Sequence, residues 1–255
     1  MYFNGKKKLI SQIKLLKNRF NIIGIKAEFE AEGSTFDDIT NLRLITEKCN
    51  TKLFVKIGGV EAINDINKCL EIGVDGIIAP MVESKFAATK FIDYFKKIKI
   101  QKNPHLSINI ETKTGYENFD EIIKETKNYI NNITVGRSDL SKSYFNKKIF
   151  PDSDFISDVI IKMAKKIKKN NITLTVGGSV SNNTIKIYKE KKNLLNLIDK
   201  IETRKVIMTS KSIVTKNAVH EALNFEKLYI LSKNEINNFR SSAETNRLTI
   251  LSTRK

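Results

Sequence analysis

The sequence predicts an α/β fold, a TIM-type (β/α)8 barrel. Short apolar runs that read as strands alternate with amphipathic segments that read as helices, which favours a parallel sheet. Several strand runs carry charges near their carboxyl ends, as in Ile108-Asn109-Ile110-Glu111 and Val55-Lys56-Ile57. Since unpaired charge is costly inside a covered sheet, these ends predict a site at the carboxyl edge of the barrel. A solvated edge strand is the alternative for any one of them.

Each element follows from its own pattern. Strands are expected at 22–30, 53–57, 76–80, 106–111, 132–136, 172–176 and within 198–208. The eighth lies at 248–251 or is missing from the barrel. Helices are expected at 6–19, from Ser34 or Thr35 to about residue 45, at 61–72, at 84–97, around 119–130, around 155–167 and from about residue 218. Seven or eight such units favour a barrel over an open doubly wound sheet.

The chain shows no linker and no shift in composition, so residues 1–255 are expected to form one barrel domain with an N-terminal helix and a C-terminal helical tail. No apolar run approaches the roughly 18 residues that a membrane span requires. The first residues contain lysines without an apolar signal core, which predicts a soluble, cytoplasmic protein with no membrane partner. Cys49 and Cys69 lack metal-site spacing and are expected to be buried free thiols.

The net charge of +17 raises the question of nucleic-acid binding. Most of the positive charge comes from lysine, whereas arginine is the residue that reads bases and grips phosphate. The lysines are spread over every expected helix, and the joint bias toward Lys, Asn and Ile is typical of AT-rich coding. We therefore expect a solvated lysine-rich surface that attracts small anions, and no nucleic-acid partner.

Two carboxylates follow neighbouring strands. Glu111 ends the fourth expected strand, and Asp139 follows the fifth. Adjacent parallel strands lie about 4.8 Å apart, so both can face one divalent ion. Two carboxylates with waters and a chelating substrate suit Mg²⁺ or Mn²⁺. The spacing leaves a second interpretation open, in which Glu111 is salt-bridged and Asp139 caps a helix or turn.

Glycine pairs follow two other strands. Lys56 precedes Gly58 and Gly59, where exposed backbone N–H groups and a positive charge suit a carboxylate or phosphate. The alternative is an ordinary tight turn, and the same holds for Gly177-Gly178.

The acidic stretch Glu28-Phe29-Glu30-Ala31-Glu32 places three carboxylates on one strand face. Mutual repulsion can raise one pKa into the range of a general base, unless the group pairs with Lys26 or Lys56. The two histidines are expected to be structural, because His105 precedes its strand at the wrong end of a barrel and His220 begins the last helix.

Four motifs together resemble the HpcH/HpaI aldolase and citrate-lyase β-subunit family. They are V-K-I-G-G-V-E-A at 55–62, L-E-I-G-V-D-G-I-I-A-P-M-V-E-S at 70–84, I-N-I-E-T at 108–112 and V-G-R-S-D-L-S at 135–141. The order and spacing match the family from about residue 22 to residue 145. Beyond residue 180 the match is only to the general plan.

The resemblance implies a metal-dependent barrel in which Glu111 and Asp139 hold Mg²⁺ or Mn²⁺. The family's substrate is a 2-oxo acid or an acyl thioester that chelates this ion. Lys56 stands where the family usually has a substrate-binding Arg, and Arg137 or Arg204 can replace the missing charge. The motif residues Gly58, Gly136 and Ser138 complete the expected substrate contacts.

The leading hypothesis is a metal-dependent carbon–carbon lyase or aldolase acting on a small 2-oxo acid or its aldol adduct. The alternatives are a citrate-lyase-β-like acyl-CoA lyase and a non-catalytic barrel subunit. The family's His in a D-x-E-H strand is absent here, so Glu30 is the expected acid–base residue, beside Lys56 as the second catalytic candidate. A metal-bound water competes with Glu30 for this role.

The C-terminal segment carries more apolar residues than one helix face needs: Ala222, Phe225, Leu228, Tyr229, Ile230, Leu231, Ile236 and Phe239. An apolar patch of this kind usually meets a partner surface. The sequence therefore predicts a homo-oligomer.

Overall fold

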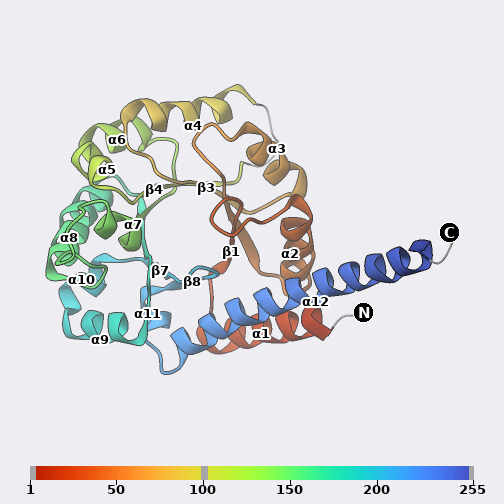
Figure 1. Cartoon of the computed structure of the whole chain (residues 1–255). Coiled ribbons are helices and arrows are strands. Elements are labelled where there is room, and N and C mark those ends of the chain that lie inside the picture. Colours follow the sequence, from red (N-terminus) through yellow and green to blue (C-terminus); the bar gives the residue numbers. More distant parts are fainter. Residues whose placement is uncertain (1–3, 99–102, 253–255) are drawn as a thin grey trace.

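The computed structural model describes residues 4–98 and 103–252 (Figure 1). Within these residues, eight strands close into a barrel in the order of the sequence, which confirms the predicted fold class. The strands are β1 (Gly24–Glu28), β2 (Lys52–Lys56), β3 (Gly76–Ala79), β4 (His105–Ile110), β5 (Asn132–Gly136), β6 (Thr173–Gly177), β7 (Lys200–Glu202) and β8 (Val206–Thr209). Strands β1 to β7 pair in parallel with their sequence neighbours, whereas β8 is antiparallel to both β7 and β1.

Helices cover the outside of the barrel (Figure 1). In the described part of the chain they are α1 (Asn4–Phe20), α2 (Phe36–Lys48), α3 (Ile63–Ile72), α4 (Lys85–Lys97), α5 (Lys113–Glu117), α6 (Phe119–Thr126), α7 (Arg137–Lys142), α8 (Asp154–Lys169), α9 (Asn182–Glu190), α10 (Lys192–Leu197), α11 (Ser210–Ile213) and α12 (Ala218–Ser252). Capping residues determine where several helices begin. Oγ1 of Thr35 accepts a hydrogen bond from the N–H of Asp38, and Oδ2 of Asp38 accepts one from the N–H of Thr35. This capping box starts α2 at Phe36.

The last two strands differ from the prediction. The single strand expected within 198–208 is a hairpin of β7 and β8, and the alternative eighth strand at 248–251 is wrong because those residues lie in α12. Thr203 closes the turn, since its N–H donates to the carbonyl of Val206 (3.0 Å) and its Oγ1 accepts from the N–H of Val206 (3.1 Å). Three residues are too few for a parallel crossover, so β8 must run antiparallel.

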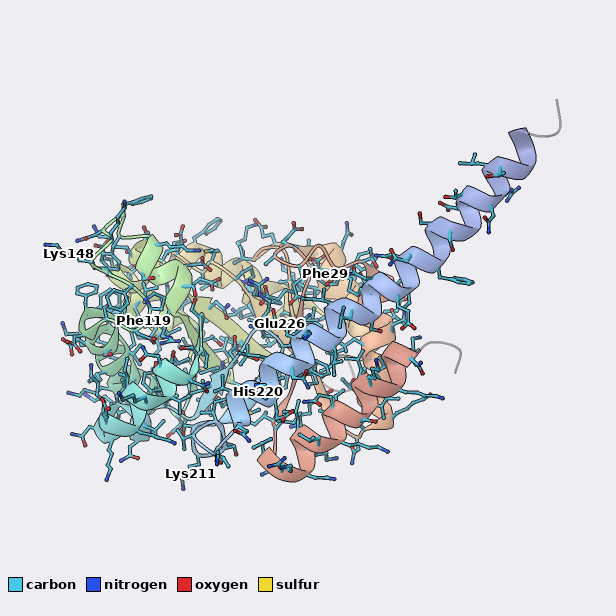
Figure 2. All side chains as sticks on the ribbon, turned by 60° about the horizontal axis from the view of Figure 1, so that its bottom comes forward. Phe29, Phe119, Lys148, Lys211, His220 and Glu226 are labelled. Atoms are coloured by element: carbon cyan, nitrogen blue, oxygen red, sulfur yellow. The ribbon has the colours of Figure 1, made fainter. Side chains whose placement is uncertain are left out.

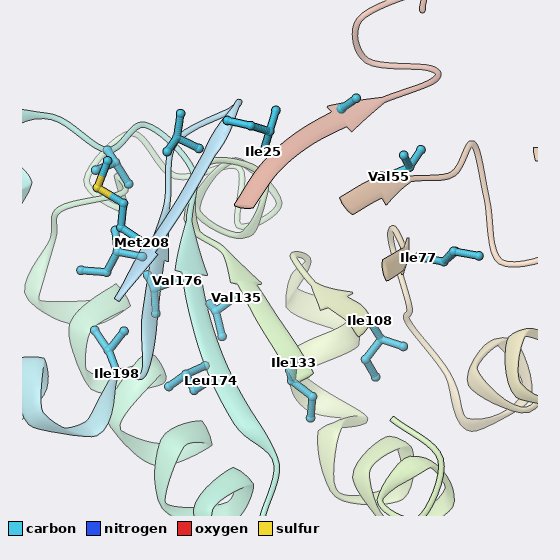
Figure 3. Packing of buried hydrophobic residues seen from close by; sticks show 14 of the residues in the cluster. Ile25, Val55, Ile77, Ile108, Ile133, Val135, Leu174, Val176, Ile198 and Met208 are labelled. Carbon is cyan, nitrogen blue, oxygen red and sulfur yellow. The ribbon is translucent and has the colours of Figure 1, made fainter. Parts of the chain in front are cut away.

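The strand alternation separates two environments. Outward-facing residues such as Ile133 and Val135 of β5, and Leu174 and Val176 of β6, belong to the main apolar core between sheet and helices (Figure 3). Cys49 and Cys69 are buried and free, as predicted. The expected alternation of apolar and polar faces is therefore the alternation of barrel exterior and interior.

The barrel interior is apolar on one side and polar on the other. Phe54, Ile78 and Ile207 form a small separate cluster. Asn132 joins the polar side, because its Nδ2 donates to Ser107 (2.8 Å) and its Oδ1 accepts from Thr175 (2.8 Å). Both sides line one interior hollow of about 20 Å³. Hydrogen bonding makes this polar layer tolerable inside the barrel.

The ring of Phe54 requires the absence of a side chain at Gly76. A Cβ added to Gly76 would lie 2.4 Å from Cδ1 of Phe54. We expect Gly76→Ala to lower the free energy of unfolding by about 1–3 kcal/mol, as overpacking does in cores. Urea unfolding measures this change. Gly59→Ala is the matched control, because a Cβ there meets nothing within 4 Å. Unchanged stability of Gly76→Ala, or a loss that the additional change Phe54→Leu does not reduce, would contradict the explanation.

The N-terminal and C-terminal helices lie side by side and antiparallel. The N–H of Gly5 donates to Oε2 of Glu235 (2.9 Å), and Nε2 of Gln12 donates to Oε2 of Glu221 (2.7 Å). Beyond this contact, α12 continues away from the barrel (Figures 1 and 2). None of the helices in residues 4–98 and 103–252 has the length and apolarity to cross a membrane.

Candidate active site

A cavity of about 390 Å³ lies at the carboxyl ends of the parallel strands. Its walls come from strand ends, the loops that follow them, and α12. The lining residues are Lys26, Glu28, Ala31, Lys56, Asn109, Glu111, Thr134, Gly136, Ser138, Asp139, Lys142, Gly177, Gly178, Ser179, Val180, Glu202, Thr203, Arg204, Leu223 and Glu226. The charged strand ends of the sequence thus meet in one place.

A larger hollow of about 620 Å³ lies at the opposite end of the barrel, beside the first residues of β2 and β4. Its carboxylate, Asp75, already pairs with Arg43 (2.7 Å) and accepts from the N–H of Leu53 (2.9 Å). His105 also lines it, and burial, with the nearby Lys200 and Lys52, lowers the pKa of this imidazole to about 4. His220 is exposed on α12 and lines neither hollow. The smaller cavity therefore holds the better set of reactive groups.

Glu111 stands in the corner between β4 and α5. Thr112 stops the strand, because its Oγ1 caps the N–H of Gly115 (3.0 Å). Oε1 of Glu111 accepts from the N–H of Met81 (3.1 Å), and Oε2 accepts from Nδ2 of Asn109 (3.3 Å). A Cβ on Gly136 would lie 2.5 Å from Oε2 of Glu111. Gly136 of the V-G-R-S-D-L-S motif thus makes room for the carboxylate of Glu111 in the I-N-I-E-T motif.

Glu111 and Asp139 line the same cavity without a cationic partner of their own. Among the described residues, neither side chain forms an ion pair within 4 Å. Asp139 lies in the first turn of α7, whose start at Gly136 has no side-chain cap. The structure therefore does not show the second interpretation of these residues, in which Glu111 is salt-bridged and Asp139 caps a helix.

Burial dominates the electrostatics of Glu111. Loss of hydration raises the pKa of this carboxyl above its usual range, and the charge of Asp139 adds to the rise. Lys56 and the N–H of Met81 oppose it without cancelling it. The protein therefore stabilises the ionised carboxylate of Glu111 less well than water does. A bound cation would supply the missing stabilisation.

Four side chains form a charged network on the other side of the cavity: the buried Glu202, Lys26 and Glu28, and the partly exposed Lys56. Nζ of Lys26 lies 2.6 Å from Oε1 of Glu202 and 3.2 Å from Oε1 of Glu28. Oε2 of Glu28 lies 3.1 Å from Nζ of Lys56. Two positive and two negative charges alternate, so this network is neutral as a unit.

The network fixes the protonation of its central members. Burial alone would lower the pKa of Lys26, but attraction to Glu202 and Glu28 outweighs it and raises the pKa well above the usual value. Burial alone would raise the pKa of Glu28, but Lys26 and Lys56 outweigh it, so the pKa of Glu28 is lowered. Lys26 is therefore an ammonium and Glu28 a carboxylate at neutral pH.

The rim of the cavity is formed by the β7–β8 turn, two loops and α12. Arg204, at the tip of the turn, is half exposed and lies 3.9 Å from Glu226 of α12, a residue labelled in Figure 2. Ser138 and Ser179 share a hydrogen bond of 2.7 Å. Gly178 has a φ of +84° and approaches the start of α7 so closely that a Cβ would lie 2.6 Å from the backbone nitrogen of Ser138. The Gly177-Gly178 pair thus lets one loop close against another.

Arg137 was expected to contact substrate, and the structure places it elsewhere. Its side chain is completely buried, with NH1 2.5 Å from Oδ1 of Asp152 and NH2 2.6 Å from the carbonyl oxygen of Gly178. Nε donates to the carbonyl oxygen of Gly177 (3.2 Å). The guanidinium therefore ties the β6–α9 loop to the segment after α7 and does not line the cavity. Motif position alone did not reveal this orientation.

Glu30 and Gly58 also lie outside the cavity lining. The period of two was extended to Glu30, but β1 ends at Glu28 and the following residues form a turn. Glu30 is exposed and covers Gly58, whose N–H already donates to Oδ2 of Asp65 (2.7 Å). Glu32 pairs instead with the buried Lys205. The three carboxylates thus have separate environments.

The sequence did not indicate that Lys26 and Glu202 form an ion pair in the cavity. Both are interior positions of their strands, but they are 176 residues apart in the chain. The charged residues on the interior face of the strands were the signal in the sequence. The pairing of Lys26 with Glu202 could not be predicted, because the β7–β8 hairpin that places Glu202 was expected to be one strand.

The closed barrel and the carboxylates at its carboxyl edge define a βα-barrel enzyme. The sequence matches the HpcH/HpaI aldolase/citrate lyase family over residues 31–175. The chain belongs to this family of aldolases and lyases, as the motifs predicted.

Solved structures agree on the fold. An HpcH/HpaI aldolase from Desulfitobacterium hafniense DCB-2 matches with 13% identity and a TM-score of 0.59, over 75% of this chain and 81% of that one. An HpcH/HpaI aldolase/citrate lyase family protein from Burkholderia cenocepacia J2315 has 11% identity and a TM-score of 0.61, over 86% and 90%. The citrate synthase variant SbnG has 14% identity and a TM-score of 0.57, over 88% and 90%. No curated protein matches the sequence.

Proposed function

We propose that this protein is a divalent-metal-dependent carbon–carbon lyase that acts on a small 2-oxo acid or its aldol adduct. The observation that carries the proposal is the pair Glu111 and Asp139, two carboxylates that line one cavity without an ion-pair partner among the described residues. Membership of the aldolase and citrate lyase family supports the reaction class.

The donor set fits Mg²⁺ or Mn²⁺. In residues 4–98 and 103–252, no three His, Cys, Asp or Glu side chains gather as a metal cluster. Mg²⁺ commonly uses one or two carboxylates and keeps several waters, so two carboxylates are sufficient when substrate oxygens complete the shell. A bound ion would supply Lewis-acid stabilisation of negative charge on the substrate oxygen.

The cationic side chains suit an anionic substrate. Lys56 lines the cavity beside Glu111, and Arg204 and Lys142 stand at its rim. Lys56 already pairs with Glu28, so it supplies only part of its charge to a ligand. Arg204 is held loosely, since its ion pair with Glu226 is 3.9 Å long. We assign the substrate carboxylate to Lys56 and Arg204, with Gly136 and Ser138 as further contacts in the same cavity.

A lysine in the cavity of a barrel also raises the possibility of a Schiff-base aldolase. Such a nucleophile must lose its proton. Lys26 lies between two carboxylates that raise its pKa, which disfavours the free amine. The electrostatics therefore favour the metal-dependent route. A non-catalytic barrel is disfavoured by the same site, because the unpaired Glu111 costs stability without a ligand.

The proposal is tested by turnover against a panel of 4-hydroxy-2-oxo acids and acyl-CoAs. Activity is measured as purified, after chelation, and after addition of Mg²⁺ or Mn²⁺. We expect release of a 2-oxo acid that stops on chelation and returns with either ion. Turnover that resists chelation would contradict metal dependence, and inactivity on the whole panel would contradict the proposed lyase. Preference for the acyl-CoAs would favour the citrate-lyase-β-like alternative.

The end of α12 supports the expected homo-oligomer. Its exposed apolar residues include Ile230, Leu231, Phe239 and Leu248, each more than half exposed. We propose that another copy of the chain covers part of this surface, and we expect light scattering to report more than one chain per particle at micromolar concentration. A monomer would contradict the proposal. Phe239→Ser combined with Leu248→Ser should shift the mass downward, whereas the control Lys211→Ser should not.

A further inference from the structure

We propose that Glu202 is the acid–base residue of this site and that Lys26 positions it. This assignment rests on the proposed lyase function and deepens it, because it names the group that moves the proton. Neither residue belongs to the motifs by which the family was identified. The sequence had favoured Glu30, whose exposed side chain lies on Gly58 and does not line the cavity.

Glu202 is selected by comparing the carboxylates that line the cavity. Glu111 and Asp139 are the candidate metal ligands. Glu28 has both oxygens paired, Oε1 with Lys26 (3.2 Å) and Oε2 with Lys56 (3.1 Å), and these lysines lower its pKa. A carboxylate so occupied is a poor base. Two candidates remain, Glu202 on β7 and Glu226 on α12.

The surroundings of Glu202 and Glu226 differ. Glu202 is only 4% exposed and is therefore largely shielded from bulk water. Glu226 lies on a helix at the rim, where its ion pair with the half-exposed side chain of Arg204 is 3.9 Å long. Proton transfer needs a carboxylate held in a defined position near the reacting atoms. Glu202 meets this condition better.

Lys26 leaves one oxygen of Glu202 available. Nζ of Lys26 binds Oε1 at 2.6 Å, and among the described residues no partner is recorded for Oε2. The side chain also packs over Gly177, where an added Cβ would lie 2.8 Å from Cγ of Glu202. One oxygen is thus fixed by an ammonium, and the other belongs to a residue that lines the cavity.

One carboxylate is sufficient for both proton transfers of an aldol cleavage. Glu202 takes the proton of the 4-hydroxyl group of a 4-hydroxy-2-oxo acid. The electron pair of that O–H bond forms the aldehyde carbonyl while the C3–C4 bond breaks, and the pair of the C3–C4 bond stays with the 2-oxo acid fragment. Glu202 then returns the proton to C3. No oxidant, reductant or further reactant is required.

The test compares Glu202→Gln with Glu30→Gln and Glu226→Gln in the metal-loaded enzyme. We expect Glu202→Gln to lower kcat about 10²–10⁴-fold, the usual contribution of an acid–base group, with unchanged metal affinity. Glu30→Gln should keep kcat within a few-fold of wild type, and Glu226→Gln, which removes the ion-pair partner of Arg204, should change KM more than kcat. In Glu202→Ala, added formate should restore part of kcat, which a purely structural role would not allow. Calorimetric metal binding and thermal unfolding show whether each variant is folded.

Lys26 is tested by a second pair of variants. Lys26→Met should lower kcat with little change in metal affinity, and Lys26→Arg should recover part of the loss because it restores a positive charge beside Oε1. A large loss in Glu30→Gln or Glu226→Gln with a near-normal Glu202→Gln would overturn the assignment, and so would absence of formate rescue. If wild type turns over no substrate on the panel, the proposed function fails and the assignment fails with it. If wild type is active and Glu202→Gln is unaffected, only the assignment fails.

Discussion

Glu111→Gln and Asp139→Asn are each expected to lower the affinity for Mg²⁺ and Mn²⁺ by more than about 100-fold and to abolish turnover. Glu111 and Asp139 line the cavity without an ion-pair partner among the described residues, so each is expected to contribute one carboxylate ligand to the ion. Removing an outer partner of a metal ligand already costs roughly 10–100-fold, and losing a ligand should cost more. Calorimetric titration of the metal-free protein measures the affinity directly.

Stability of the metal-free variants separates loss of the ion from loss of the fold. Burial raises the pKa of Glu111, so its ionised form is disfavoured in the folded protein at neutral pH. A neutral glutamine removes this cost, and we expect metal-free Glu111→Gln to unfold at a denaturant concentration no lower than that of metal-free wild type. Equal metal affinity in wild type and both variants would refute the site. Asp93→Asn, on α4 and outside the cavity, provides a matched control with unchanged affinity.

Arg137→Met is expected to lower the free energy of unfolding by about 3–5 kcal/mol, the cost of breaking a buried ion pair. The substitution removes the cationic partner of Asp152, which keeps the hydrogen bond from Thr184 (3.0 Å), and it removes donors from the carbonyls of Gly177 and Gly178. Urea unfolding of the metal-free protein measures the effect. This outcome distinguishes a structural guanidinium from the substrate contact that the motif had suggested.

Arg204→Met is the natural comparison. The side chain of Arg204 is half exposed, and its ion pair with Glu226 is 3.9 Å long. Surface ion pairs of this kind contribute about 0–1 kcal/mol to the free energy of unfolding. We therefore expect nearly unchanged stability with a raised KM for the anionic substrate. If Arg137→Met unfolds like wild type but raises KM, the two arginines have the opposite roles.

The barrel fold could be predicted from the sequence because the patterns that determine its strands and helices are local. Strand alternation, helix spacing and caps such as Thr35 lie within a few residues of the feature that they determine. The β7–β8 hairpin was not readable, since Thr203-Arg204-Lys205 contains no Gly, Pro or Asn to mark a turn. A hydroxyl that bonds the backbone of Val206 turns the chain instead. The eighth strand was therefore expected at 248–251 or not at all, whereas β8 is Val206–Thr209.

The site was predictable only in part for the same reason. Glu111 reaches the cavity because it ends a strand, which alternation shows. Arg137 begins α7, and its direction depends on Asp152, fifteen residues later in a loop without periodicity. The partnership of Lys26 and Glu202 depends on barrel closure. Residue types and strand ends thus indicate which groups meet, whereas long-range contacts decide which of them are already satisfied.

The contact of α1 with α12 also bears on how the protein is made. Gln12 and Glu221, which hydrogen-bond across this contact, are 209 residues apart. At roughly 5–20 residues per second, a ribosome takes on the order of 10–40 seconds to synthesise the intervening chain. During that interval the face of α1 that later meets α12 has no partner. The wall of the barrel that contains α1 is thus completed only after α12 has been synthesised, and until then α1 exposes an amphipathic face.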